Sequence, residues 1–224
     1  MYKRQITDIT GLGTENTILT LIPNFDDYTV EILPQGLVLS FAGTLDIGYP
    51  FEDKGRRRIS CSFTFTNRKE LNDFIDFWYD RKGALKRFWI PCWFNEFKLV
   101  EPIEKNSSEA KVYLTNLALR NDEHLRVFLF IYKGDLSESE LIVRKINDIV
   151  VDTIHKTETL YFDSVLNRKV YPQEVTIFGR VLLVRFSENG IELQCFFTKA
   201  NELYVKASCS FLELPSEYEE IEGA

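Results

Sequence analysis

The alternation of apolar and polar residues predicts a chain that folds mainly into β-strands. The clearest alternation covers residues 58–66, where Ile59, Cys61, Phe63 and Phe65 are separated by arginine, serine and threonine residues. Successive side chains of a strand point to opposite faces, so this segment is expected to bury one face and to expose the other.

Short apolar runs elsewhere predict further strands. The runs at residues 17–22, 28–33 and 36–41 are separated by short turns, which leave no room for crossover helices and therefore favour antiparallel pairing. Residues 188–190, Glu-Asn-Gly, are interpreted as a hairpin turn that joins two strands at 181–186 and 191–197. Other strands are expected at residues 112–119, 127–132, 141–151, 159–162 and 203–211.

One segment, residues 68–81, has the period of an amphipathic helix. Asn67 is expected to cap it, with Glu70 placed three residues later as in a capping box. Gly83 is expected to end it in a left-handed conformation. The apolar residues of one helix face are expected to be buried, and these are Leu71, Phe74, Ile75 and Trp78.

Residues 88–94 form an aromatic block that is apolar at both its odd-numbered and its even-numbered positions. Pro91 donates no hydrogen bond to a β-ladder, so the block is expected along a sheet edge or between two layers rather than in a central strand. Two interpretations of Trp89 and Trp93 stay open. Either they complete the core, or they lie with Pro91 at an interface between subunits, where aromatic residues are enriched.

Arginines occupy residues 56–58, directly before the alternating strand at 59–65. They form either a solvated strand entrance or a basic patch that contacts an acidic surface, including that of a neighbouring copy of the chain. The candidate residues for a subunit interface are therefore Arg56, Arg57, Arg58, Trp89, Pro91 and Trp93.

Composition narrows the classes of protein that fit. The 224 residues include 34 acidic and 27 basic side chains, a formal net charge of -7 that argues against general nucleic-acid binding. No apolar run reaches the length of about 18 residues that indicates a membrane-spanning helix, so no membrane insertion is expected. The N-terminus lacks the apolar block of a secretory signal, so the chain is expected to begin in a cytoplasm.

The sequence contains no convincing catalytic, cofactor-binding or metal-binding set. Its four cysteines lack the paired spacing of zinc ligands, so we expect no metal and no cofactor. Without a secretory signal the thiols are expected to stay reduced. The chain is therefore not expected to be an enzyme. The cysteines are Cys61, Cys92, Cys195 and Cys209.

Residues 56–99 resemble the minor tail and distal tail proteins of long-tailed bacteriophages. The stretch RRRISCSFTFTNRKELNDFIDFWYDRKGALKRFWIPCWFNEFKL has the element order of that group: an alternating strand at 59–65, a helix at 71–78, a Lys-Gly bend at 82–83 and the block FWIP at 88–91. The resemblance implies an antiparallel β-sandwich, related to tail-tube subunits, with one flanking helix. It also implies a ring, usually of six copies, that joins the tail tube to the tail tip and contacts neighbouring tube and hub proteins.

The resemblance leaves residues 105–173 without a match. We expect a β-sandwich core formed by residues 1–104 and 174–224, and an inserted or peripheral β-rich domain at 105–173. The first hypothesis is a structural component of a virion tail, assembled in the host bacterial cytoplasm. One alternative is a receptor- or carbohydrate-binding tail module, which exposed Tyr or Trp in residues 105–173 would favour. A third hypothesis, an enzyme that cleaves cell-wall polymer, requires paired carboxylates in a cleft.

Overall fold

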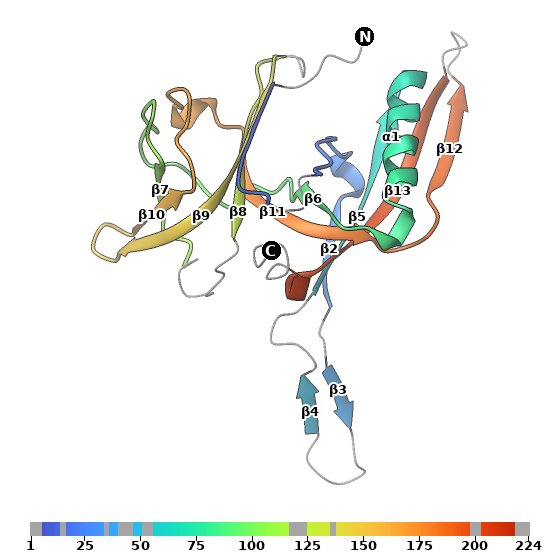
Figure 1. The fold of residues 1–224 in the computed structure, drawn as a ribbon, viewed down its shortest axis with the longest axis horizontal. Coiled ribbons are helices and arrows are strands. Elements are labelled where there is room, and N and C mark those ends of the chain that lie inside the picture. The colour runs from blue at the N-terminus through green and yellow to red at the C-terminus, as the bar shows by residue number, and fades with distance from the viewer. Residues whose placement is uncertain are drawn as a thin grey trace. The chain divides into compact units, whose positions relative to one another are not determined.

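The computed structural model describes residues 6–13, 17–33, 36–39, 47–50, 56–116, 125–134, 138–197 and 203–217. Their fold is mainly β and sandwich-like, with largely antiparallel pairing and one α-helix among the described residues, α1 (Arg68–Asp80), which confirms the predicted fold class (Figure 1). The strands are β1 (Ile6–Ile9), β2 (Thr29–Leu33), β3 (Gly36–Leu39), β4 (Ile47–Pro50), β5 (Arg56–Phe65), β6 (Phe88–Pro91), β7 (Glu109–Tyr113), β8 (Arg126–Ile131), β9 (Glu140–Asp152), β10 (Thr157–Phe162), β11 (Ile177–Phe186), β12 (Glu192–Phe197) and β13 (Leu203–Glu213).

The chain divides into two compact units. Unit 1 comprises Met1–Thr20 and Trp89–Leu182, and unit 2 comprises Leu21–Phe88 and Leu183–Ala224. These boundaries differ from the expected ones at residues 104/105 and 173/174. The reason is that Phe97, Ile103 and Phe178, which lie outside residues 105–173, share one apolar core with residues of β7 to β10. The segment expected to be inserted therefore does not form a core by itself.

Unit 1 contains an antiparallel sheet in the order β11-β8-β9-β10-β7, and β1 pairs in parallel with β9. All six residues of β8 are buried, so this strand is covered on both faces. Val127, Leu129 and Ile131 belong to the core cluster of the unit. On the other face, the rings of Phe128 and Phe130 each lie 5.5 Å from the ring of Trp93. Burial on two faces explains the continuous apolar run that the sequence shows at this strand.

Unit 2 contains a second antiparallel arrangement in which β5 lies between β2 and β13. The inward side chains of β5, including Ile59 and Cys61, are buried, as its alternation predicted. Ser62, expected on the exposed face, is also buried, because Asn24 and Asp27 hydrogen-bond to its hydroxyl. Helix α1 packs on this face through Phe74, whose ring centroid lies 5.6 Å from that of Phe63 and 5.3 Å from that of Phe65. Strands β3 and β4 pair with each other.

The ends of α1 follow the predicted signals with one shift. The side chain of Asn67 accepts a hydrogen bond from the Lys69 N–H at 2.8 Å, which confirms Asn67 as the N-cap. The helix ends at Asp80, and the left-handed conformation begins at Lys82 (φ 53°) and continues at Gly83 (φ 59°). The left-handed conformation expected at Gly83 is therefore present, and Lys82 shares it.

The apolar face of α1 is less deeply buried than its spacing predicted. Phe74 is 2% exposed, but Leu71, Ile75 and Trp78 are only half-buried. Phe77, which the predicted stripe omitted, contacts the ring of Phe88 at a centroid distance of 5.1 Å. The ring contacts thus centre on Phe74 and Phe77 because those residues face the aromatic side chains of the sheet.

The predicted hairpin between β11 and β12 does not form. Both strands instead pair with the same side of β13: Phe186 of β11 is opposite Phe211, and Glu192 of β12 is opposite Ser208. At eleven residues, β13 is long enough to receive two short partners in succession. The turn at residues 187–191 therefore carries the chain along the edge of β13 rather than back onto β11.

Candidate functional site

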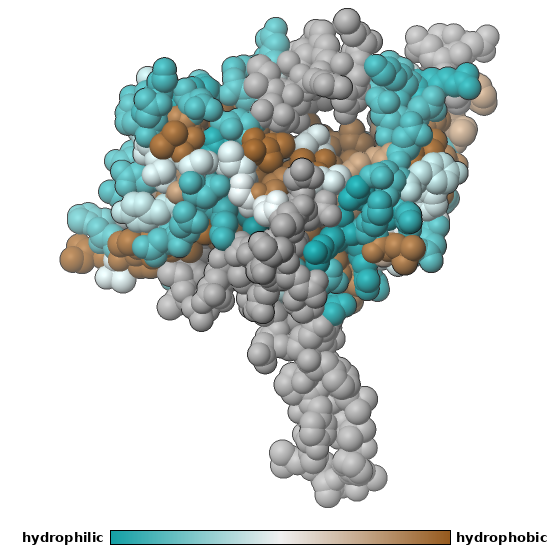
Figure 2. Space-filling model, in the orientation of Figure 1, coloured by the Kyte–Doolittle hydropathy of each residue, from teal (hydrophilic) through white to brown (hydrophobic). Residues whose placement is uncertain are grey.

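Strand β12 is an exposed edge of the unit 2 sheet. All six of its residues are exposed, and within the described part of the chain it pairs only with β13. Leu193, Cys195 and Phe197 lie opposite Ala207, Val205 and Leu203, so they extend the apolar, helix-facing side of the sheet to its edge. Phe197 is 75% exposed, and Figure 2 shows tan, apolar side chains at the end of this strand.

Strand β2 is the opposite edge of the same sheet. Among the described residues it pairs only with β5. Val30 and Ile32 lie opposite Ile59 and Arg57, so they share the helix-facing side with the apolar residues of β12. Ile32 is 76% exposed. The sheet of unit 2 therefore presents two apolar edges of similar length, one at each side.

Within the described residues no further strand pairs with either edge, and each edge strand carries a single charged residue, Glu31 or Glu192. Edge strands are normally blunted by lysine, proline, a bulge or a covering segment. The sequences TVEIL of β2 and ELQCFF of β12 contain no lysine, arginine or proline. Their unpaired backbone groups and apolar side chains can therefore accept a further strand.

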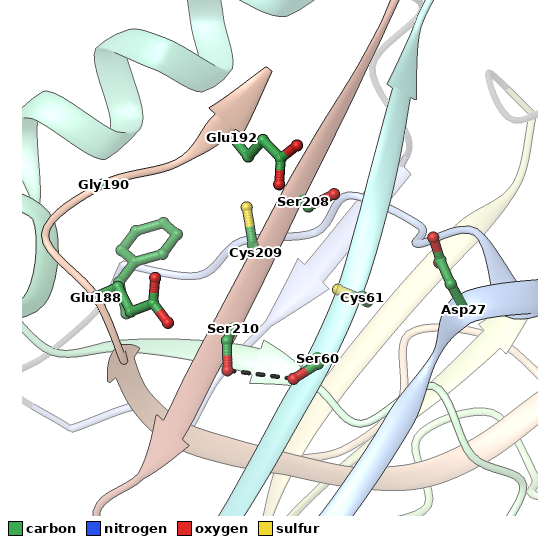
Figure 3. A pocket seen from close by; sticks show the side chains of 10 residues that line it. Asp27, Ser60, Cys61, Glu188, Gly190, Glu192, Ser208, Cys209 and Ser210 are labelled. Carbon is green, nitrogen blue, oxygen red and sulfur yellow. Dashed lines mark hydrogen bonds between the residues drawn. The ribbon is translucent and has the colours of Figure 1, made fainter. Parts of the chain in front are cut away.

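A pocket of about 330 Å³ lies at the break between the two partners of β13. Cys209 and Ser210 fall between the last residue paired with β12 and the first paired with β11, so no strand covers their edge. Figure 3 shows side chains from β5, β13 and the turn after β11 around this space, with a 3.3 Å hydrogen bond between Ser60 and Ser210. The remaining lining residues are Asp27, Cys61, Phe186, Glu188, Gly190, Glu192 and Ser208.

Asp27 is a pocket residue whose ionisation is perturbed. Partial burial raises its pKa, but hydrogen bonds from Lys206 and Ser62, with the charge of Lys206, together lower the pKa below its ordinary value. The Lys206 Nζ lies 2.6 Å from the Asp27 Oδ2, and the Ser62 hydroxyl donates to the same oxygen at 2.7 Å. Asp27 is therefore ionised at neutral pH and does not act as a proton donor there.

The pocket cysteines are protonated at neutral pH. Burial, with added repulsion from Cys209 and Asp27, raises the pKa of Cys61 far above its ordinary value. Burial also raises the pKa of Cys209 to about 12. Because the thiolate is the nucleophilic form, neither cysteine is activated for nucleophilic catalysis. All four cysteines are free, and Cys61, Cys92 and Cys209 are buried.

The three candidate arginines lie at the start of β5, and two of them already have acidic partners. Arg57 forms an ion pair with Glu213 at 3.4 Å, and Arg58 forms one with Glu31 at 3.3 Å. These contacts within the chain neutralise much of the proposed basic patch. The arginines are therefore a weaker candidate for an interface with acidic residues of another copy than their sequence indicated.

The aromatic candidates lie inside the fold. Trp89 is fully buried, Trp93 is 6% exposed, and Pro91 is also buried. In unit 1, the Trp89 indole N–H donates to the carbonyl of Leu12 at 3.2 Å. Buried side chains offer no surface to a partner, so the core interpretation replaces the interface interpretation for these three residues. They belong to unit 1, whereas the three arginines belong to unit 2.

The sequence patterns did not single out the two edges or the pocket. The mixture of polar and apolar residues at 192–197 does not show whether a neighbouring strand covers this strand. The pocket residues come from four separate segments of the chain. Among the described residues, no group of three or more His, Cys, Asp and Glu side chains could hold a metal ion. Among those residues, no helix is long and apolar enough to cross a membrane.

Neither a family model nor a curated protein matches the chain.

Proposed function

We propose that this chain is a structural subunit of a bacteriophage or prophage tail, of the distal-tail or minor-tail kind. In this proposal identical copies form a ring between tail tube and tail tip, with tube and hub proteins as further neighbours. The observation that carries it is the pair of exposed apolar edges, β2 and β12, on one sheet of unit 2. The resemblance of residues 56–99 to tail proteins supplies the biological setting.

The two edges suit repeated contact between identical copies. They differ in sequence, so β12 of one copy meeting β2 of the next is a heterologous contact, which closes into a ring or continues as a filament. Pairing would satisfy the backbone groups of both strands and would cover Ile32, Leu193 and Phe197. The proposed contact therefore buries the most exposed apolar side chains of the two edges.

Cross-linking of adjacent edges tests this arrangement. Cys195 is a natural exposed thiol on the helix-facing side of β12, and Ile32→Cys places a second thiol on the same side of β2. A short bismaleimide added to the concentrated variant is expected to produce dimers, trimers and a larger series that stops at the closed ring. Denaturing electrophoresis would resolve that series, and negative-stain imaging would show the ring.

Two control variants make the cross-linking result specific. Leu85→Cys introduces a thiol at a position of the same exposure as Ile32 but outside strands β2 and β12, and it should give no series. Adding Cys195→Ser to Ile32→Cys should abolish the series, because each copy then has a reactive thiol at one edge only. Equal series from the Ile32 and Leu85 variants would contradict the proposal.

A second candidate function, recognition of carbohydrate, is favoured by exposed tyrosines in unit 1. Tyr113 on β7 is 51% exposed with the Lys98 Nζ 5.8 Å from its ring centroid, and Tyr132 is 49% exposed. Exposed aromatic rings beside polar groups can pack on sugar rings, as in other β-rich modules. Titration with cell-wall oligosaccharides tests this candidate, since Tyr113→Ala should weaken binding if the ring contacts sugar.

A further inference from the structure

Two buried cysteines of unit 2 lie directly opposite each other on neighbouring strands. The register of β5 and β13 pairs Cys61 with Cys209. Opposite residues of an antiparallel pair point to the same face, so both side chains lie on the helix-facing side of the sheet. Figure 3 shows the Cys61 sulfur on the side of β5 that faces β13.

The hydrogen-bond pattern fixes the spacing of these two residues. The Ser62 carbonyl accepts from the Asn24 N–H at 2.8 Å, so the backbone polar groups of Ser62 point away from β13. Those of the preceding residue, Cys61, therefore point toward β13, which makes Cys61 and Cys209 a hydrogen-bonded pair. Such pairs have Cα atoms about 5.5 Å apart, within the range of about 4.4–6.8 Å that disulfides join. Their Cβ atoms lie toward the wide end of about 4.5–5.5 Å, whereas a disulfide requires about 3.5–4.5 Å, so the bond requires a small approach of the two strands.

We propose that Cys61 and Cys209 form an oxidation site, which a low-molecular-weight disulfide converts into a cross-strand disulfide through a small local approach of β5 and β13. Both residues line the pocket at the break beside β13, and this pocket gives the co-reactant a path to them. The inference concerns unit 2 of a single copy, so it is independent of whether copies assemble through β2 and β12.

The reaction is two successive thiol–disulfide exchanges. One cysteine loses its proton, and its sulfur attacks the small disulfide, forming a mixed disulfide and releasing one small thiolate. The other cysteine loses its proton and attacks the protein sulfur of the mixed disulfide, which forms the Cys61–Cys209 bond and releases the second thiolate. The released thiolates take up the two protons, so the two protein thiols are oxidised and one small disulfide is reduced.

The reaction should be slow near neutral pH and faster in alkaline solution. Burial raises the pKa of Cys209 to about 12, so only a small fraction is thiolate at pH 7. Below that pKa the thiolate fraction, and with it the oxidation rate, should rise about tenfold per pH unit. Above about pH 8.5, the ordinary pKa of a thiol, the oxidation rate of an exposed thiol levels off, whereas that of this buried pair should continue to rise.

Glutathione disulfide is the probe for the experiment, applied to the folded Cys195→Ser chain at pH 8. Peptide mapping without reduction is expected to show the Cys61–Cys209 link and an intact mass lower by two hydrogen atoms. Cys92 is the internal control, because it is also buried with a pKa of about 12 but has the Glu96 carboxylate, 3.7 Å from its sulfur, as its hydrogen-bond acceptor. Cys92 should remain available for alkylation after the chain is unfolded.

A second variant and a stability measurement complete the test. In the Cys61→Ser, Cys195→Ser chain, Cys209 has no partner and should remain a thiol or stop at the glutathione adduct. The linked chain should unfold at a higher urea concentration than the reduced chain, because a cross-link between distant residues restricts the unfolded ensemble. The inference is overturned if Cys61 and Cys209 stay free, stop at the adduct, or link only when urea unfolds the chain.

Discussion

At the scale of single residues, aromatic rings hold α1 on the sheet of unit 2. Phe74 meets Phe63 and Phe65, and Phe77 meets Phe88 and lies 6.4 Å from the ring of Phe186. Such pairs add about 0.5–1.5 kcal/mol each to the gain from burial. The position of the helix thus depends mainly on the rings of Phe74 and Phe77, which are three residues apart, rather than on the whole predicted stripe.

We expect Phe74→Ala to lower the free energy of unfolding by about 3–5 kcal/mol, because it removes a fully buried ring and leaves a cavity. Trp78→Ala should cost less, since Trp78 is only half-buried. Urea denaturation followed by circular dichroism measures both changes. Asn72→Ala, on the exposed side of the same helix, should change the free energy by less than about 0.5 kcal/mol. Equal losses for Phe74 and Asn72 would show that α1 does not dock through Phe74.

The Asp27 carboxylate predicts a dependence of stability on acid. Its pKa is lower in the folded chain than in the unfolded one, so the ionised form stabilises the fold above the ordinary pKa of about 3.9. That contribution is lost as the pH falls through the lowered pKa of the folded state. Asp27→Asn should therefore be less stable than the natural chain at pH 6, and the difference should shrink toward pH 2. Thermal unfolding at a series of pH values measures it, and a difference independent of pH would contradict the assignment.

Gly179 lies close to the backbone of a segment that is distant in the sequence, and this leaves no room for a side chain. A Cβ atom at this position of β11 would lie 2.3 Å from the Phe94 carbonyl oxygen. Gly179→Ala is therefore expected to lower the free energy of unfolding by about 1–3 kcal/mol through overpacking. Gly190→Ala is the matched control, because nothing lies within 4 Å of its added Cβ. Urea unfolding of the two variants should separate them, and equal midpoints would contradict this close approach.

At the scale of elements, the sequence predicted what local chemistry determines. The cap at Asn67, the alternation of β5 and the apolar run of β8 each depend on neighbours within a few residues, and the structure confirms them. The partner of a strand depends instead on competition between distant segments. Strands β11 and β12 fit a hairpin by their turn, but both pair with the same side of β13 instead. The pocket follows from that competition, so no local pattern could have predicted it.

At the scale of the whole chain, the sequence predicted two β-rich parts but not the boundaries between them. A boundary is set by which side chains share a core, and Phe97 and Phe178 join the core of β7 to β10 from outside residues 105–173. The same limit applies to the candidate interface. The sequence favoured Trp89, Pro91 and Trp93, which the fold buries, whereas Ile32 and Phe197 are exposed on strands whose composition is unremarkable. Exposure is a property of the assembled fold, and composition alone does not report it.

The proposed head-to-tail contact makes a prediction about mixtures of two variants. Ile32→Lys places a charge on the β2 edge, and Phe197→Lys places one on the β12 edge, at side chains that are 76% and 75% exposed, so neither change should disturb the fold. Each variant keeps one intact edge and should remain monomeric alone, because a chain of contacts needs both edges. Mixed together, they should form a one-to-one dimer that grows no further.

Native mass spectrometry and analytical ultracentrifugation of the separate and mixed variants measure this outcome. The intact β12 of the Ile32→Lys chain would pair with the intact β2 of the Phe197→Lys chain, and the two remaining edges would both be charged. Leu85→Lys, at a 76% exposed side chain outside strands β2 and β12, should assemble like the natural chain. A symmetric contact between two β12 edges predicts something different, because the Ile32→Lys chain would then dimerise alone and mixing would add nothing. Dimers of that variant by itself would therefore exclude a ring built from β12 and β2.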